Sequence, residues 1–271
     1  MTPLIRPLTI AAILALALGG CATTSAPTAD PQNGIRLPPA GVGFDYQLGG
    51  PYDPPAGVVV VARDSTVEPA SGSYNICYIN GFQTQPGEAA LWLSPHPDLL
   101  LHDEAGEPIV DPDWPDEYLL DTSSPQKRSQ IADLLTARIA ACASADYDAV
   151  EIDNLDSYSR SNGALTLENN IALATAYATA AHDLNLAIAQ KNGAGSSQQF
   201  RDAVGFDFAV TEECARYDEC ADYTDTYGAL VFDIEYSASH LAAACTAVGS
   251  AILRDLDLTT PDHADYVFKS C

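Results

Sequence analysis

The chain alternates short apolar runs with helix-like runs along most of its 271 residues, and this alternation constrains its fold more than any other feature. Eight runs have the length and the β-branched or aromatic content of strands: residues 44–48, 58–62, 75–80, 149–153, 187–191, 208–212, 230–235 and 251–254. Helix-like stretches lie between the later runs, at residues 126–143, 167–184, 197–204 and 239–248. Strands that alternate with helices form a parallel sheet, and eight of them can close into a barrel.

The early part of the chain departs from this regular pattern in two places. Residues 63–73 are too short and too rich in Pro, Gly and Ser for a full helix. Residues 82–117 form a long Pro- and Asp-rich segment that contains Trp92, His96, His102 and Trp114. A segment of this length is expected to be an ordered loop over one face, where it could wall a groove. The predicted fold is therefore α/β, a (β/α)8 TIM-type barrel with a degenerate early crossover and a long loop after its third strand.

Carboxylates stand at the ends of two predicted strands about sixty residues apart. The sequence EIDNLD at 151–156 ends the strand at 149–153, and TEEC at 211–214 ends the strand at 208–212. Barrels of this type place their chemistry just past the carboxyl ends of their strands. Glycoside hydrolysis needs a pair of carboxyl groups, one as acid and the other as nucleophile or base. The two runs therefore predict an acid/base enzyme, with Asp153 and Glu212 as its candidate pair.

Other polar residues are predicted at the same end of the barrel. The candidates for substrate contact are Tyr46, Gln47, Tyr78, Asn80, Asp121, Glu151, Asn154, Lys191, Asn192, Glu235 and Tyr236. Glu235 is the main rival of the Asp153 and Glu212 pair, and it could instead bind a substrate ammonium. Lys191 could pair with Asp153 or Glu235 and keep one of them ionised, or be a structural ion-pair partner. Asp121 and Asp64 are equally consistent with a turn or cap.

The N-terminus has the form of an export signal. Arg6 precedes an apolar run over residues 8–18, which is too short to span a membrane and is typical of a secretory signal. The run ends in Gly-Gly-Cys21 and resembles the lipobox of bacterial lipoproteins, although an ordinary signal peptide would also fit. The predicted organisation is a lipoprotein signal peptide at 1–20, a flexible tether at 21–39 and one catalytic domain at 40–271. Lipid on Cys21 would then give membrane contact for an exported cell-membrane or cell-surface protein.

Six cysteines remain after Cys21, an even number in a chain that is expected to be exported. They allow fifteen pairings. Locality and strand order favour three of these pairs, Cys77 with Cys142, Cys214 with Cys220, and Cys245 with Cys271. Zinc is the weaker alternative because the chain has no CxxC pair and its five histidines do not cluster, so no metal is expected.

The formal net charge is −25, from 12 Lys and Arg against 37 Asp and Glu. Phosphate binding depends on Lys and Arg, so nucleic acid is not expected as a partner. The charge would favour a cationic polysaccharide by raising its local concentration, and it is equally consistent with an acidic surface that is simply hydrated. Motifs GxSxG, P-loop, GxGxxG and HExxH are absent, which leaves serine-hydrolase, nucleotide-binding and zincin readings without support.

An ordered set of motifs resembles glycoside hydrolase family 114, the endo-α-1,4-polygalactosaminidases. The motifs are YQL (46–48), ICY (76–78), YLLD (118–121), DAVEIDNLD (148–156), QKN (190–192), FDFAVTEEC (206–214), YDEC (217–220) and EYS (235–237). The resemblance implies a TIM-type barrel without a cofactor, a retaining mechanism, Asp153 as nucleophile and Glu212 as general acid/base. Two features depart from the family pattern, the short crossover at 63–73 and Glu213, where the family commonly has Gln.

Such a mechanism makes demands on the two carboxyl groups. Asp153 must be ionised, whereas Glu212 must hold a proton, so its surroundings are expected to raise its pKa through burial or through the charges of Glu213, Glu151 and Asp156. The loop after Glu212 is expected to be fixed by the disulfide between Cys214 and Cys220. Two alternatives stay open, a hydrolase of another amino-sugar polymer and a lipoprotein that binds glycans without cleaving them.

Overall fold

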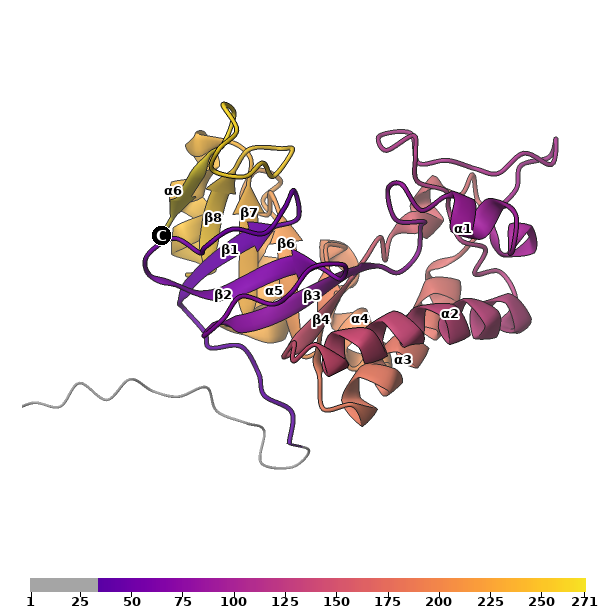
Figure 1. The fold of residues 1–271 in the computed structure, drawn as a ribbon, viewed down its shortest axis with the longest axis horizontal. Helices are drawn as coiled ribbons and strands as arrows, with labels where there is room; N and C mark the ends of the chain where they lie inside the picture. The colour runs from indigo at the N-terminus through magenta and orange to yellow at the C-terminus, as the bar shows by residue number, and fades with distance from the viewer. Residues whose placement is uncertain (1–33) are drawn as a thin grey trace, which may run out of the picture.

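The computed structural model describes residues 34–271 and forms one sheet of nine strands in sequence order. Eight parallel strands curve into a nearly closed barrel (Figure 1). Their bounds are β1 Gly43–Gln47, β2 Val58–Asp64, β3 Tyr74–Asn80, β4 Ala149–Asp153, β5 Ala187–Lys191, β6 Phe208–Glu212, β7 Val231–Glu235 and β8 Ala251–Arg254. The predicted α/β barrel is confirmed, and four of its strands have the predicted bounds.

The two halves of the barrel are connected differently. Loops join β1 to β2 and β2 to β3, the second of these as the short segment at 63–73 predicts. From β3 onward every crossover contains a helix: α2 Pro125–Ser144, α3 Leu167–Asp183, α4 Ser197–Val204, α5 Cys220–Tyr227 and α6 Ala238–Ala247. Helix α5 and the short α1, Ala90–Leu93, were not predicted, and α1 has too few residues to show helical periodicity.

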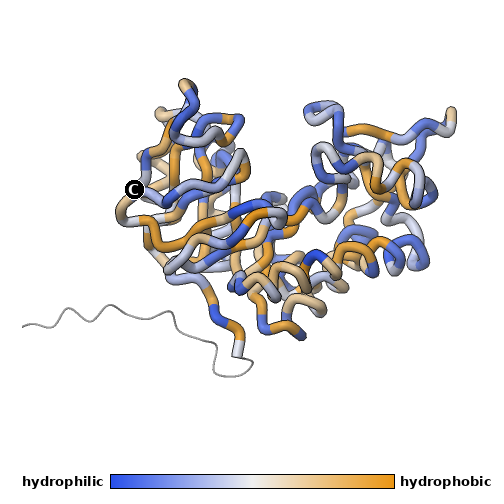
Figure 2. The backbone as a smooth tube through the Cα atoms, viewed as in Figure 1, coloured by the Kyte–Doolittle hydropathy of each residue, from blue (hydrophilic) through white to orange (hydrophobic). Residues whose placement is uncertain are grey.

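The strands are buried on both sides because side chains pack inside the barrel and also against the helices. Inside it, Phe44, Phe208 and Phe232 meet with ring centroids 5.3 Å and 6.0 Å apart, opposite small side chains such as Ala149 and Ala187. A larger cluster lies between the strands and the helices. Figure 2 shows the resulting pattern, with hydrophobic stretches along the strands and hydrophilic stretches in the loops. Because successive side chains of a strand point to opposite faces, alternate residues of each strand face the barrel interior.

Side chains link β1 to β8 at the seam of the barrel, and a ninth strand extends the sheet beyond β8. The antiparallel β9, Phe268–Ser270, pairs with β8. The buried Arg254 at the end of β8 donates hydrogen bonds to the backbone oxygens of Tyr46, Val267 and Thr259, and it also pairs with Asp45 at 3.3 Å. One guanidinium therefore links β1, β8 and the C-terminal segment where the parallel ladder stops.

The long segment between β3 and α2 is an ordered loop, as predicted. Isolated bridges join Gln83 to Leu119, Leu100 to Leu120, His102 to Pro108 and Val110 to Tyr118. The short 3-10 helix η1, Pro97–Leu99, and α1 lie within it. The loop folds back on itself beside the carboxyl ends of β3 and β4, so it is in place to form a wall.

Three disulfides join Cys77 to Cys142, Cys214 to Cys220 and Cys245 to Cys271, which confirms the expected pairing. They tie β3 to α2, the end of β6 to the start of α5, and α6 to the C-terminus. Two of them therefore secure elements that carry residues at the mouth of the barrel.

Residues 34–39 pack on the barrel although they were predicted to belong to the tether. Ile35 is buried, Arg36 pairs with Asp148, and Tyr74 donates a hydrogen bond of 2.7 Å to the Arg36 oxygen. Because Asp148 and Tyr74 lie at the amino ends of β4 and β3, this segment covers the bottom of the barrel. The signal peptide at 1–20, Cys21 and most of the tether lie outside the described residues. Within residues 34–271 no helix is long and apolar enough to cross a membrane.

Candidate active site

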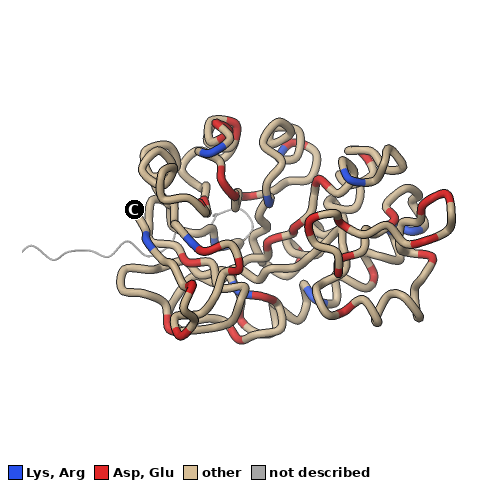
Figure 3. Tube along the Cα trace, turned by 90° about the horizontal axis from the view of Figure 1, so that it is seen from above, with Lys and Arg blue, Asp and Glu red and all other residues tan. Residues whose placement is uncertain are grey.

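A pocket of about 490 Å³ opens at the carboxyl ends of the barrel strands. It has two sides, which we name by their origin. The barrel wall consists of Tyr46, Tyr78, Asp153, Asn154, Lys191, Asn192, Glu212 and Tyr236, and the loop wall consists of Asp111, Asp113, Trp114 and Glu117. Eight lining residues in all are Asp or Glu, against one Lys and one Arg. The pocket shares the acidic character of the whole chain, on which Figure 3 shows many acidic and few basic residues.

Asp153 is the last residue of β4 and its side chain enters the pocket. Residues 149, 151 and 153 alternate into the barrel, and Asn154 follows in a left-handed conformation with φ 64° that ends the strand. The Tyr78 hydroxyl donates to Asp153 Oδ2 at 2.7 Å, and the Asn154 backbone N–H donates to Oδ1 at 2.7 Å. Both oxygens are therefore oriented by hydrogen-bond donors.

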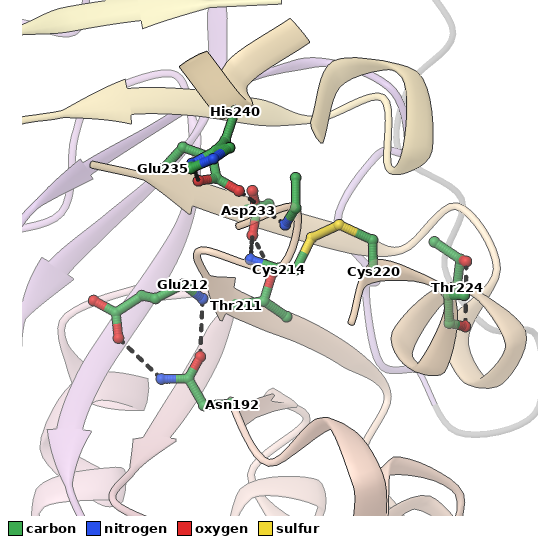
Figure 4. The surroundings of a disulfide bond; sticks show 11 residues. Asn192, Thr211, Glu212, Cys214, Cys220, Thr224, Asp233, Glu235 and His240 are labelled. Carbon is green, nitrogen blue, oxygen red and sulfur yellow. Dashed lines mark hydrogen bonds and ion pairs between the residues drawn. A yellow bond between two sulfur atoms is a disulfide. The ribbon is translucent and has the colours of Figure 1, made fainter. Parts of the chain in front are cut away.

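Glu212 is the last residue of β6 and faces the same space. Asn192 holds it twice, because its Nδ2 donates to Oε2 at 2.9 Å and its Oδ1 accepts from the Glu212 backbone N–H at 2.8 Å (Figure 4). The Tyr236 hydroxyl donates to Oε1. Asn192 and Tyr236 directly follow β5 and β7, so the two neighbouring strands fix Glu212 between them.

The ammonium of Lys191 lies at the centre of the barrel wall. Its Nζ is 3.4 Å from Asp153 Oδ2, 3.2 Å from Glu212 Oε2 and 3.5 Å from Glu151 Oε1. It also donates to the hydroxyl of Tyr46 at 3.1 Å, and that hydroxyl donates to Glu151 at 2.7 Å. Only 2% of the Lys191 side chain is exposed, so one buried cation serves three carboxylates. The contact with Asp153 is one of the two pairings that the sequence allowed; the one with Glu235 does not form in the described structure.

These contacts shift the pKa values of Glu212 and Glu151 in directions that the sequence analysis did not predict. Burial acts to raise the pKa of Glu212, but the charge of Lys191 and the hydrogen bonds from Tyr236 and Asn192 outweigh it, so the pKa lies below its ordinary value. The expectation of a raised pKa for Glu212 is therefore wrong. Burial raises the pKa of Glu151 to about 7 against the opposing charge of Lys191. Glu151, beneath the pocket, therefore holds a proton more readily than Glu212 does.

The loop after Glu212 is fixed from behind by β7. Phe232 and Ile234 face the barrel interior, so Asp233 and Glu235 point the other way, toward that loop. Glu235 Oε1 accepts from the backbone N–H of Ala215 at 2.9 Å, and Asp233 Oδ1 accepts from that of Cys214 at 3.2 Å, beside the Cys214–Cys220 disulfide (Figure 4). Glu235 lies outside the pocket lining, so it supports the loop where a substrate contact was expected.

Glu213 takes a left-handed conformation, with φ 56°, and turns away from the pocket. Its carboxylate pairs with Arg216 at 2.6 Å. The strand therefore ends at Glu212, and the Glu213 charge is satisfied outside the site.

Three other predicted contact residues lie behind the pocket surface. Asp121 accepts from the Ser123 backbone N–H at 2.9 Å, which is the turn role that the sequence left open, and it also pairs with Lys127 in the first turn of α2. Gln47 is buried and accepts from Arg63 Nε at 2.9 Å. Asn80 bonds Glu117 and Asn154. Each positions a lining element without itself facing the pocket.

The loop wall contributes residues that sequence reasoning did not single out. Asp111 is buried and pairs with Arg160 at 2.7 Å, and Arg160 also reaches Asp156 at 2.9 Å and donates to Asn154 Oδ1 at 2.9 Å. Glu117 faces the pocket nearby. The available signal was the Pro- and Asp-rich composition around Trp114, which predicted a wall but not its carboxylates. Within residues 34–271 no cluster of three or more His, Cys, Asp or Glu side chains is arranged to hold a metal.

An eight-stranded parallel barrel with two strand-end carboxylates around one ammonium, in an open polar pocket, has the arrangement of a glycoside hydrolase. The model of glycoside-hydrolase family GH114 matches residues 24–271. The chain belongs to this family, and it is a glycoside hydrolase.

Solved structures share the fold. A crystal structure of Ega3 from Aspergillus fumigatus in complex with galactosamine is 24% identical, has a TM-score of 0.70, and aligns over 88% of this chain and 98% of its own. The glycoside hydrolase domain of PelA from Pseudomonas aeruginosa is 15% identical, has a TM-score of 0.55, and aligns over 83% of this chain and 97% of its own. No curated protein matches the sequence.

Proposed function

We propose that the protein is an exported, lipid-anchored endo-glycosidase that hydrolyses α-1,4-linked galactosamine-containing polysaccharide by a retaining mechanism. The observation that carries the proposal is the shared contact of Asp153 and Glu212 with the ammonium of Lys191 in an acidic pocket. Membership of GH114 supports the reaction class. The galactosamine bound in the Ega3 crystal structure supports an amino-sugar substrate, and a pocket with eight acidic residues suits a cationic polymer.

In the first step, Asp153 attacks the anomeric carbon while Glu212 gives its proton to the glycosidic oxygen, whose bond to that carbon breaks. Tyr78, Asn154 and Lys191 contact the two Asp153 carboxylate oxygens and orient them for this attack. In the second step, Glu212 takes a proton from a water molecule that attacks the same carbon, and the Asp153 carboxylate leaves. Two inversions give net retention.

The first step needs a proton on Glu212, but the pKa of Glu212 lies below its ordinary value. Lys191, Tyr236 and Asn192 all favour the ionised form. A bound sugar must therefore remove at least one of these donors from Glu212, or the enzyme must work at a pH low enough to protonate it. Either route makes kcat/KM fall as the pH rises through the pKa of Glu212, so we propose an optimum on the acidic side of neutrality.

The test compares product formation by the protein from residue 22 onward with that by its Asp153→Asn and Glu212→Gln variants. The substrates are deacetylated and N-acetylated α-1,4-galactosaminan. We expect oligosaccharides from the wild type and a loss of about 10²- to 10⁴-fold in each variant. Glu213→Gln is the matched control, because it removes the adjacent charge outside the pocket and should retain activity. NMR of the first product should show the α-anomer.

Three results would count against the proposal. A β-anomer as first product would exclude a retaining mechanism. Cleavage of only a different amino-sugar polymer would show that α-1,4-galactosaminan is not the substrate. Binding of the polymer without products from any form would favour a non-catalytic glycan-binding protein.

The lipid anchor is part of the same proposal. Residues 34–39 pack at the amino ends of the strands, opposite the pocket, so a tether that enters there would present the pocket away from the membrane. Cys21→Ser should release the protein from the membrane fraction of the producing cells. Unchanged retention of that variant would rule the anchor out.

A further inference from the structure

Glu117 is a carboxylate of the loop wall that the two-step mechanism does not use. The residue is 6% exposed and lines the pocket. Its Oε2 accepts a hydrogen bond of 2.8 Å from Asn80 Nδ2. The nearby cations are engaged elsewhere, Arg160 with Asp111 and Asp156 and Lys191 with the barrel-wall carboxylates, and within residues 34–271 Glu117 has no ion-pair partner.

This situation differs from that of four other carboxylates in the pocket, Asp111, Asp113, Asp153 and Glu212. Asp111 is also buried, but it pairs with Arg160 at 2.7 Å. Asp153 and Glu212 share Lys191, and the exposed Asp113 is open to water. Burying a carboxylate without a cation is costly, and a cationic ligand group would relieve that cost.

Glu117 is also joined to the reacting carboxylate by a short chain of hydrogen bonds. Asn80 donates to Glu117, Asn154 Nδ2 donates to Asn80 Oδ1 at 2.9 Å, and the Asn154 backbone N–H donates to Asp153. Burial, together with the charges of Asp153, Asp111 and Asp116 and against the hydrogen bond from Asn80, raises the pKa of Glu117 to about 7. A sugar placed at Asp153 therefore has the unpaired carboxylate of Glu117 within its neighbourhood.

We propose that Glu117 binds the ammonium group of a sugar next to Asp153 and gives the enzyme its preference for free amino sugars over N-acetylated ones. The inference rests on the proposed function. An ammonium supplies the missing cation and a donor, whereas an acetamide is neutral and leaves the buried carboxylate unpaired. Sites built around a buried polar group reject ligands that fail to satisfy it, so one residue can set this preference.

The experiment uses Glu117→Gln, which keeps the shape of the side chain and its ability to accept from Asn80. We expect its kcat/KM on deacetylated α-1,4-galactosaminan to fall at least ~10-fold, mainly through KM, with little change on the N-acetylated polymer. Asp116→Asn is the matched control, since it removes the same charge from an exposed neighbour outside the pocket lining and should change neither value. Glu117→Asp retains the charge and should recover part of the preference.

Binding measurements keep the test independent of turnover. In an Asp153→Asn background, titration with galactosamine oligosaccharides and with N-acetylgalactosamine oligosaccharides should show the wild-type preference for the amine, and the added Glu117→Gln change should abolish it. The inference is overturned if Glu117→Gln keeps the preference, or if Asp116→Asn weakens amine binding equally, which would indicate a general field. Failure of the wild type to cleave either polymer would instead overturn the proposed function.

Discussion

The barrel wall and the loop wall both bring carboxylates to the pocket, but they hold them in different ways. On the barrel wall, Asp153 and Glu212 end strands, and each accepts two or more hydrogen bonds around the buried Lys191. On the loop wall, Glu117 has one donor, and Trp114 is 50% exposed. Groups that react need fixed geometry and are best placed on rigid elements, whereas groups that select a ligand can sit on a loop. In the proposed function, the barrel wall therefore carries out the chemistry and the loop wall selects the sugar.

Removal of the central cation is the strongest way to break this comparison. Lys191→Met leaves Glu151 buried beside Asp153 without a counter-charge, so we expect the free energy of unfolding at pH 8 to fall by about 3–5 kcal/mol. The loss should be smaller at pH 5, because Glu151 then holds a proton. Activity should fall at least ~100-fold, since Asp153 and Glu212 lose their shared partner. Urea denaturation at both pH values and steady-state kinetics measure these effects.

The control for this prediction is Lys127→Met, which removes a lysine that also pairs with a carboxylate, Asp121, at a site where a third of its side chain is exposed. It should cost no more than about 1 kcal/mol. Equal costs for the two variants would show that the barrel wall does not depend on its central ion cluster.

Two of the disulfides allow an effect on the free energy of unfolding to be separated from an effect on the position of Glu212. Cys77–Cys142 closes a span of 65 residues and Cys214–Cys220 a span of 6, so loop-closure entropy predicts losses of about 4 and about 2 kcal/mol when each pair is replaced by serine. The smaller loop lies directly behind Glu212. We therefore expect its removal to lower kcat more than removal of the larger one, measured well below both melting temperatures. The reverse order for kcat would show that the support behind Glu212 is not needed.

What the sequence could reveal also differs between the two walls. Asp153 and Glu212 end apolar runs, and a strand's alternation and its end are local properties, so their shared position could be predicted. The contacts of each carboxylate could not be predicted, because they come from neighbouring strands. Lys191 lies on β5, between the strands of Asp153 and Glu212, and its charge helps to reverse the pKa shift expected for Glu212. Glu235 also ends an apolar run, but its side chain points away from the barrel interior. Which face it takes depends on the packing on both sides of β7, which the sequence does not show. Glu117 lies in a segment without periodicity, where only composition is available.

Two buried carboxyl groups, Asp233 behind the barrel wall and Glu117 on the loop wall, predict a smaller effect, a dependence of stability on pH. Burial raises the pKa of Asp233 to about 7 despite the hydrogen bond from Thr211, and that of Glu117 to about 7. Between the unfolded pKa values near 4 and these folded values, the folded protein holds protons that the unfolded chain has lost. Stability is therefore full at low pH and is lost as the pH rises through 7. Asp233→Asn and Glu117→Gln, neutral at every pH, should each reduce the loss from pH 5 to pH 8, by roughly 2 kcal/mol.

Adding galactosamine to the same stability measurements should separate the contribution of Glu117 from that of Asp233. It should lower the pKa of Glu117 by pairing with the ionised form, and so reduce the pH dependence of stability in Asp233→Asn. Glu117→Gln keeps Asp233, which lies behind the pocket at the loop after β6, so its pH dependence should not respond to the sugar. A response of equal size in both variants would mean that the sugar acts on the barrel as a whole, and the division between a reacting wall and a selecting wall would not hold.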